Sequence, residues 1–215
     1  MSKEKLNYSF INTCAPVIKG LTIANTITGK KGTYNYLLNV LDNSPLSIHL
    51  LHKNKKNEII LIYREANLKE YLFKDEVKTY LKELGYKRCD LNYVLNKLTK
   101  RFSSFYLKKS TFPHELGIIL NYPIEDIKGF IENEGKNYLA CKYWKVYSNL
   151  NETLKVFKEF DKALETSLKQ LLSGYRLNEI IEGAIWLILF IGHYQETLKW
   201  WQKLLVKVLK KVVRK

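Results

Sequence analysis

The sequence predicts an α+β protein that is mostly helical, with a small antiparallel sheet and one helix-turn-helix-like pair. Several segments repeat apolar side chains every three or four positions, which is typical of helices packed on one face. Two short runs rich in isoleucine and leucine flank a polar turn, which is typical of a β-hairpin. The chain of 215 residues, 46% apolar and 13% aromatic, is also large enough to bury a core without disulfides or metal.

The first third of the chain predicts two helices and the hairpin. A helix is expected after Cys14-Ala15-Pro16 and runs toward Thr28, and a short helix is expected over 34–41. Residues 46–51 and 58–64 form the expected hairpin around the turn HKNKKN. The run 59–62 is apolar on both faces, so this strand should be covered on both sides.

The rest of the chain predicts longer helices and a third strand. Helical spacing covers 68–84, where Gly85 provides a helix end, and then 91–107, 150–172 and the chain from 177 onward. Residues 138–147 alternate in a strand-like way. We therefore expect the sheet to consist of the hairpin with 138–147 as its third strand.

The stretch FPHELGIILNYP, residues 112–123, predicts the helix-turn-helix-like pair. Asn121 can adopt the left-handed conformation of a sharp turn, Pro123 can start the second helix, and Gly117 lies where the two helices should touch. His114 would lie about 200° around the first helix from Phe112, outside its buried stripe. The second helix offers Lys128 against four acids, which argues against DNA reading and favours a structural or protein-binding pair: Glu125, Asp126, Glu132 and Glu134.

A possible catalytic group of residues combines this stretch with the N-terminal helix. A thiol near a helix N-terminus has a lowered pKa, so Cys14 could be a nucleophile with His114 as base and Glu115 or Asp126 as the orienting carboxylate. No nucleophile motif surrounds Cys14, and a small buried cysteine is the alternative interpretation. Cys89 and Cys141 are expected to be packing residues.

No cofactor is expected. His49 and His52 flank the hairpin turn and could form a metal or haem site with His114 only if the fold gathered them, because their spacing is no ligand motif. GKKGTY lacks the spacing of a phosphate loop. Residues 142–147 interleave lysines with aromatics, as in single-strand nucleic-acid binding, but a strand packed through Trp144 and Val146 is favoured.

The last part of the chain is strongly basic. The formal net charge is +15, and residues 198–215 carry seven cations and no acid, which leaves +8 (15 − 7) for the other 197 residues. The longest apolar run, 184–192, is nine residues, whereas a membrane-spanning helix needs about 20. The first residues also lack the apolar core of a signal peptide.

An amphipathic helix is predicted over this basic segment. Its apolar stripe repeats at intervals of three and four residues: Leu198, Trp201, Leu205, Val208 and Val212. We predict that it binds an anionic membrane surface or an acidic protein partner through Lys199, Trp201, Lys203, Lys207, Lys210 and Lys211. The alternative is that the stripe packs on the domain or on a second copy, which would make a homo-oligomer.

Four motifs carry a resemblance to a known family: CAP at 14–16, FPHELG at 112–117, NYPIEDIKGFI at 121–131 and YWKVY at 143–147. Together they resemble an uncharacterised bacterial family, domain of unknown function 3793, over roughly residues 12–177. Asn121 stands where the family pattern has glycine, and both residues tolerate the turn. The resemblance implies an intracellular bacterial protein, chiefly from anaerobes, and provides no activity, fold or catalytic residue.

These observations predict one α+β domain over 1–183 and a basic helical tail over 184–215. An odd number of scattered cysteines indicates a reduced, cytoplasmic setting, with peripheral membrane association through the tail. The favoured function is a binding or regulatory module. The alternatives are a cysteine-dependent acyl-transfer or hydrolytic enzyme that uses Cys14 and His114, and, more weakly, a nucleic-acid-binding protein.

Overall fold

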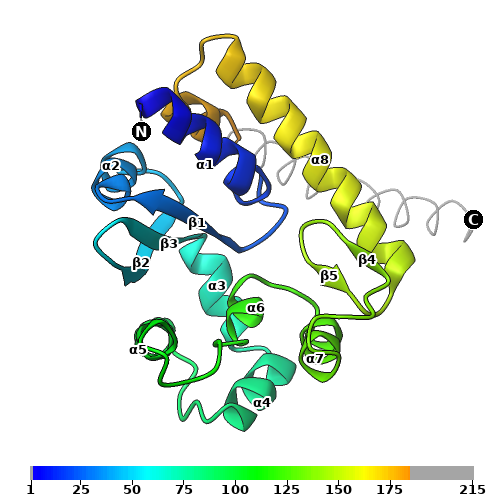
Figure 1. Ribbon diagram of the computed structural model, residues 1–215. Helices are drawn as coiled ribbons and strands as arrows, with labels where there is room; N and C mark the ends of the chain where they lie inside the picture. The colour runs from blue at the N-terminus through cyan, green and yellow to red at the C-terminus, as the bar shows by residue number, and fades with distance from the viewer. Residues whose placement is uncertain (1, 185–215) are drawn as a thin grey trace, which may run out of the picture.

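The most apolar of the described strands lies at the centre of its sheet, and helices cover both faces of that strand. The computed structural model describes residues 2–184 (Figure 1). The elements along the chain are α1 (Lys3–Ile18), β1 (Ala24–Lys30), α2 (Thr33–Val40), β2 (Ser47–Lys53), β3 (Asn57–Tyr63), α3 (Glu65–Leu72), α4 (Asp75–Glu83), α5 (Leu91–Tyr106), α6 (Leu116–Ile119), α7 (Ile124–Glu132), β4 (Ala140–Cys141), β5 (Lys145–Val146) and α8 (Leu150–Leu172), followed by a helical segment over 177–184. The predicted class, α+β and mostly helical, is confirmed.

β3 separates two apolar cores. The strand order is β1-β3-β2, and both pairings are antiparallel. Ile60 and Ile62 belong to a core with α1, α2 and the segment 177–184, whereas Leu61 and Tyr63 belong to a core with α3, α4, α5 and α6. The prediction that this strand is covered on both sides is therefore confirmed.

The third strand of the sheet is β1, so the prediction that a helix follows Cys14-Ala15-Pro16 and runs toward Thr28 is wrong. α1 begins at Lys3 and ends at Ile18. Its end is closed by Gly20, which has a φ of 72°, and by Arg64, which donates from Nε to Val17 O (2.8 Å) and from Nη2 to Ile18 O (2.7 Å). The chain then turns back and pairs with β3 from Ala24↔Tyr63 onward.

Residues 138–147 were predicted as the third strand of this sheet, and they instead form a separate two-stranded sheet, β4 and β5. Val146 is fully buried, as predicted for a packed strand. The hairpin β2–β3 and the helices α2, α5 and α8 lie where the sequence predicts them. The expected helix over 68–84 is divided into α3 and α4, because the backbone tightens into turns at Phe73 and Lys74.

The helix pair is present, but its first helix is short. α6 has four residues, and Asn121 adopts the predicted left-handed conformation with a φ of 62°. A Cβ on Gly117 would lie 2.9 Å from Ile127 Cγ1, which confirms that the elements touch there. His114 precedes α6, so its predicted place on the far face of a helix is wrong, and its side chain is half-buried.

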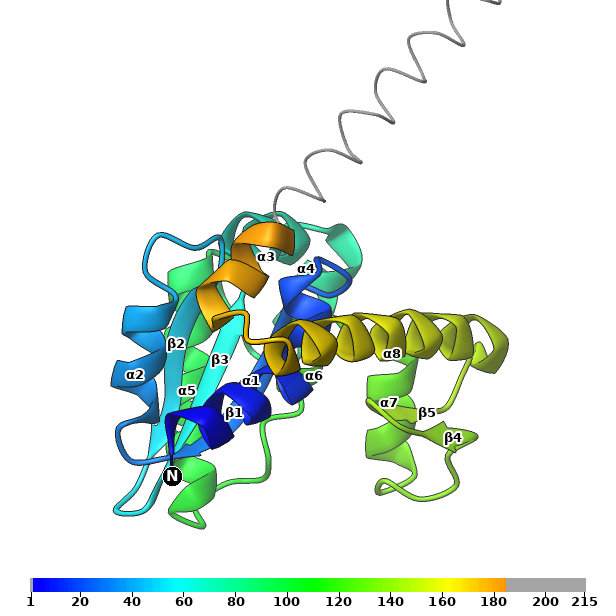
Figure 2. The same cartoon turned by 90° about the horizontal axis from the view of Figure 1, so that it is seen from above.

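α8 connects the two ends of the molecule. Seen from above, it runs from α1 to the β4–β5 hairpin and α7 (Figure 2). Near its C-terminal end Gln170 accepts a hydrogen bond from Lys19 Nζ (3.2 Å), and in its middle Asp161 accepts one from Tyr143 Oη (3.0 Å). Among the helices of residues 2–184, none combines the length and the apolar character needed to cross a membrane.

Candidate ligand-binding site

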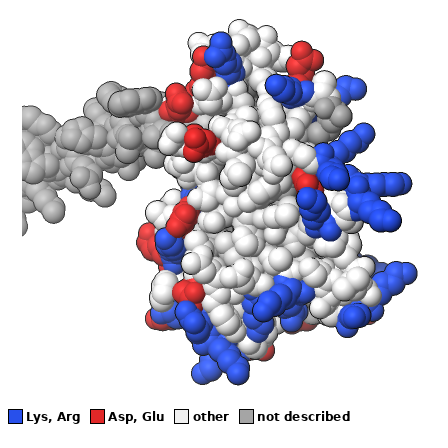
Figure 3. Space-filling model, turned by 90° about the vertical axis from the view of Figure 1, so that its left-hand side faces the viewer, with Lys and Arg blue, Asp and Glu red and all other residues white. Residues whose placement is uncertain are grey.

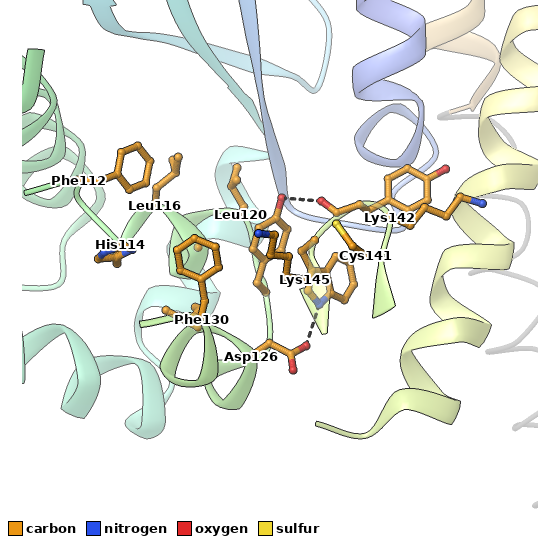
Figure 4. Close-up of a pocket in the computed structure, with 14 residues that line it drawn as sticks. Phe112, His114, Leu116, Leu120, Asp126, Phe130, Cys141, Lys142 and Lys145 are labelled. Atoms are coloured by element: carbon orange, nitrogen blue, oxygen red, sulfur yellow. Dashed lines mark hydrogen bonds between the residues drawn. The ribbon is translucent and has the colours of Figure 1, made fainter. Parts of the chain in front are cut away.

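A pocket lies between the helix pair and the β4–β5 hairpin (Figure 4). Its cavity volume is about 370 Å³, within the range of roughly 300–1,000 Å³ that is common for small-molecule sites. Its walls are mostly aromatic and aliphatic, with two lysines and one carboxylate among them. The lining residues are Phe112, His114, Leu116, Gly117, Leu120, Tyr122, Asp126, Ile127, Phe130, Cys141, Lys142, Tyr143, Trp144 and Lys145.

Asp126 fixes the hairpin against α7. Its Oδ1 accepts hydrogen bonds from Tyr147 N (2.8 Å), Ser148 N (2.9 Å) and Ser148 Oγ (3.1 Å), and its Oδ2 accepts from Trp144 Nε1 (2.8 Å). The side chain is buried. A buried carboxylate is stable only when its oxygens are hydrogen-bonded, and here four donors from the hairpin and the turn before α8 meet that need.

Trp144 and its neighbours build one aromatic wall. The Trp144 ring stacks on Tyr122 with centroids 5.1 Å apart, and it packs edge to face with Phe157 of α8 with centroids 4.6 Å apart. Tyr143 packs on Phe160 at 5.0 Å. Burial raises the pKa of Tyr122 to about 12, and burial together with the nearby Asp161 raises that of Tyr143 to about 12, so both phenols are neutral hydrogen-bonding groups at pH 7.

Lys145 places a cation beside aromatic rings. Its Nζ lies 5.6 Å from the Phe130 ring centroid and 5.0 Å from that of Tyr138, and it donates a hydrogen bond to Gly135 O (2.6 Å). Figure 4 shows Lys145 beside Phe130 within the pocket. The other lysine, Lys142, forms an ion pair with Asp161 of α8 (2.5 Å). Lys145 is therefore the lysine of this wall without a carboxylate partner among the described residues.

His114 lies at the opposite end of the pocket. Its ring centroid is 5.6 Å from that of Phe112 and 5.7 Å from that of Phe130. Burial lowers the pKa of His114 and outweighs the effect of Glu115, which raises it, so the neutral ring is favoured at pH 7. Figure 4 shows His114 near Phe112 and Phe130, on the side of the pocket away from Lys142.

Glu115 is adjacent in sequence but points into a different environment. Its carboxylate is fully buried, forms an ion pair with Arg101 and accepts a hydrogen bond from Tyr86 Oη (2.9 Å). It does not line the pocket. The predicted role of Glu115 in orienting His114 therefore finds no support, because its contacts tie the start of α6 to α5.

Cys14 and His114 are not brought together. Cys14 is fully buried in the core of α1, α2 and the segment 177–184, and His114 lines the pocket. Burial raises the pKa of the Cys14 thiol well above its usual range. The argument for a reactive thiol also fails on position, since Cys14 lies near the C-terminal end of α1 and not at the start of a helix. Cys14 is a core residue.

The hairpin histidines pack on α5. His49 Nε2 lies 2.8 Å from Thr99 Oγ1, and the His52 ring stacks on Tyr106 with centroids 4.0 Å apart. The third histidine of the predicted metal or haem site, His114, lines the pocket and not this surface of α5. Within residues 2–184 no three His, Cys, Asp or Glu side chains gather as metal ligands.

The surface predicted on the C-terminal tail lies outside the described residues. It consists of Lys199, Trp201, Lys203, Lys207, Lys210 and Lys211.

The sequence singled out several residues that line this pocket, but it did not predict that they lie together. The alternating lysines and aromatics of 142–147 were visible, but their strand was expected to join the hairpin, which would have separated them from Phe130. Asp126 is the residue that could have indicated the contact between 142–147 and the helix that carries Phe130. It is an acid on the apolar face of a helix next to Ile127, and such a residue needs donors from another segment.

The model of the family described as protein of unknown function, DUF3793, matches residues 10–181, so the chain belongs to this family. The match contains α7, the β4–β5 hairpin and every residue that lines the pocket. No curated protein and no solved structure matches the chain.

Proposed function

We propose that the protein is a binding module whose pocket takes a small, planar, anionic ligand of the aromatic carboxylate class. The observation that carries the proposal is the Lys145 ammonium, which lies among aromatic rings and has no carboxylate partner among the described residues. The role is one of binding, because the described part of the pocket pairs no nucleophile with a base.

The shape of the pocket favours a flat ligand. Aromatic side chains stack on other flat rings with centroids about 4.5–7 Å apart. Phe130 is 36% exposed although it lines a pocket, so a ligand that covered its ring would remove apolar surface from water.

The charge of the pocket favours an anion. An ammonium carries three N–H donors, and Lys145 uses one of them on Gly135 O. The oxygens of Asp126 are occupied by four donors, and Lys142 is paired with Asp161. A carboxylate that entered the pocket would accept from the free donors of Lys145, and such charge-assisted bonds are about twice as strong as neutral ones.

The test compares 2-naphthoate with 2-naphthamide, its neutral analogue of the same shape, by isothermal titration calorimetry on the full chain. We expect naphthoate to bind at least about tenfold more tightly, since one hydrogen bond to a charged group contributes roughly 1.5–3 kcal/mol. Lys145→Met should remove this preference. Lys136→Met, which removes an exposed lysine outside the pocket, should keep it. Equal binding of the two compounds to the wild type, or no binding of either, would reject the proposal.

A second candidate function rests on residues 184–215. Seven cations without an acid over 198–215, together with the stripe through Trp201, support binding to an anionic membrane surface or an acidic partner from the cytoplasmic side. Trp201→Ser combined with Lys203→Gln and Lys207→Gln should weaken sedimentation with phosphatidylglycerol vesicles. Unchanged sedimentation of this variant would count against the tail as the anchor.

A further inference from the structure

Three segments form one lysine-rich end of the main sheet, and it lies apart from the pocket. They are the β1–α2 turn, the β2–β3 turn and the end of α5. Lys31 N donates a hydrogen bond to Lys56 O (3.1 Å), which joins the first two, and the His52–Tyr106 ring stack joins the third. We name as the lysine end the exposed side chains that these segments carry: Lys30, Lys31, Lys53, Lys55, Lys56, Lys108 and Lys109.

Defined turns hold these lysines. In the β2–β3 turn, Asn54 Oδ1 accepts from Lys56 N (2.9 Å) and Asn57 N (2.8 Å). After α5, Lys108 adopts a left-handed conformation with a φ of 57°, and Lys109 N donates to Ser104 O (2.9 Å). The cations are thus attached to an ordered backbone, so less conformational entropy is lost when the surface binds a partner.

The positive charge of the lysine end is not balanced. Residues 29–34, 52–58 and 104–111 contain one acid, Glu58, which is 2% exposed. Its oxygens are used by Tyr34 N (2.9 Å) and Lys53 Nζ (3.8 Å). None of the other six lysines has an acidic partner within 4.0 Å among the described residues, whereas each of three lysines on α8 is paired with a glutamate: Lys155, Lys162 and Lys169.

Figure 3 shows the face that carries α2 and α5, where blue side chains project together from one edge of the molecule with few acids among them. Gathered like charges repel and raise the local positive potential. A surface of opposite charge would relieve this repulsion, so the charge of the lysine end favours a polyanionic partner.

We propose that the lysine end docks on an anionic membrane surface. Leu107 is 65% exposed and Tyr106 is 43% exposed, directly beside Lys108 and Lys109. An apolar tip surrounded by lysines suits a bilayer interface, where Leu107 enters the acyl boundary while the lysine heads stay among the lipid phosphates. This interaction is separate from the pocket and does not use residues 185–215.

A nucleic acid is the less suitable polyanion for this end. The three segments contain no arginine, the residue that pairs with phosphate through two parallel hydrogen bonds. One face of the Tyr106 ring is covered by His52, which reduces its use for base stacking. An exposed leucine at the tip also has no favourable role on a phosphate backbone.

The test is co-sedimentation of the full chain with sucrose-loaded vesicles made of equal parts phosphatidylglycerol and phosphatidylcholine. A surface lysine contributes about a fivefold change in binding to an anionic membrane. We expect the triple variant Lys55→Gln, Lys56→Gln and Lys109→Gln to bind at least about tenfold more weakly than the wild type. Leu107→Ser should also weaken binding, with its melting temperature unchanged.

The matched control is Lys155→Gln, Lys162→Gln and Lys169→Gln, which removes the same charge from α8. We expect it to change vesicle binding less than about threefold, because these lysines lie outside the lysine end. Equal losses in the two triple variants would overturn the proposal. It would also be overturned if the first triple variant kept its vesicle binding and lost binding to polyuridylate RNA instead.

Discussion

At the scale of single residues, Asp126 joins two walls of the pocket. It joins α7 to β5 and to the turn before α8, and it is the only hydrogen-bonding partner that the structure gives to the Trp144 indole N–H among the described residues. Asn121 is a second such position, because its left-handed turn starts the segment that leads into α7. Asp126 and Asn121 fix the positions of the segments around the pocket. We therefore expect their substitution to lower the free energy of unfolding.

Asp126→Asn is expected to destabilise the fold by roughly 2–4 kcal/mol. An asparagine amide has one acceptor oxygen, and its NH₂ group would face either the Trp144 donor or the three donors on Oδ1. Urea unfolding followed by circular dichroism measures the change. Glu125→Gln, a neighbouring exposed position, is the control and should be neutral. A loss below about 0.5 kcal/mol for Asp126→Asn would contradict this role.

At the scale of elements, the close approach of α7 to the β4–β5 hairpin forms the aromatic wall. A Cβ added to Gly129 would lie 2.5 Å from both Cβ and Cγ of Tyr147. The position of Tyr147 Cβ is fixed by the backbone, so a side-chain rotation alone cannot relieve this contact. The small residue in the middle of α7 therefore sets the distance between the helix and the hairpin.

Gly129→Ala should lower the free energy of unfolding by about 1–3 kcal/mol, because overpacking outweighs the helix propensity gained. Gly183→Ala is the matched control, since a Cβ there meets no atom of residues 2–184 within 4 Å and alanine favours the helix. Denaturant unfolding of the two variants gives the comparison. If Gly129→Ala were as stable as Gly183→Ala, the close contact between α7 and Tyr147 would be disproved.

The elements also show what the sequence could and could not predict. β2 and β3 were predictable because two runs rich in isoleucine and leucine flank a polar turn, and α8 was predictable because its apolar side chains recur at helical spacing over 23 residues. β1 was missed because ANTITGK is mostly polar and overlaps the end of the helix expected to run toward Thr28. The pocket could not be predicted, because contacts between segments about 20 residues apart, such as Trp144 with Asp126, determine it.

At the scale of the whole molecule, β3 contributes side chains to two cores, and α8 links the sheet to the pocket.

Three half-buried histidines are distributed over this structure: His49 and His52 on β2, and His114 in the pocket. In each of them burial lowers the pKa, so the folded state disfavours the protonated ring. The unfolded state therefore binds more protons than the folded state near pH 6.

The free energy of unfolding is expected to be largest above the unfolded histidine pKa of about 6.5 and to fall as the pH drops from 8 to 5.5. Carboxylates with lowered pKa values, such as Asp161, contribute only at lower pH. Urea titrations across this range measure the slope. His49→Gln should make the slope shallower. Stability that stayed constant or rose on acidification would contradict the burial of these rings.

The binding of a planar anion beside Lys145 is tested most directly by the indole N–H signals in a ¹H–¹⁵N spectrum of the full chain titrated with 2-naphthoate. The chain has four tryptophans, and Trp144→Phe assigns the pocket signal. We predict a saturable shift of the Trp144 signal, with little change at Trp186, Trp200 and Trp201, and no such shift in Lys145→Met. A Trp144 signal that stays in place while the other three move would contradict the account.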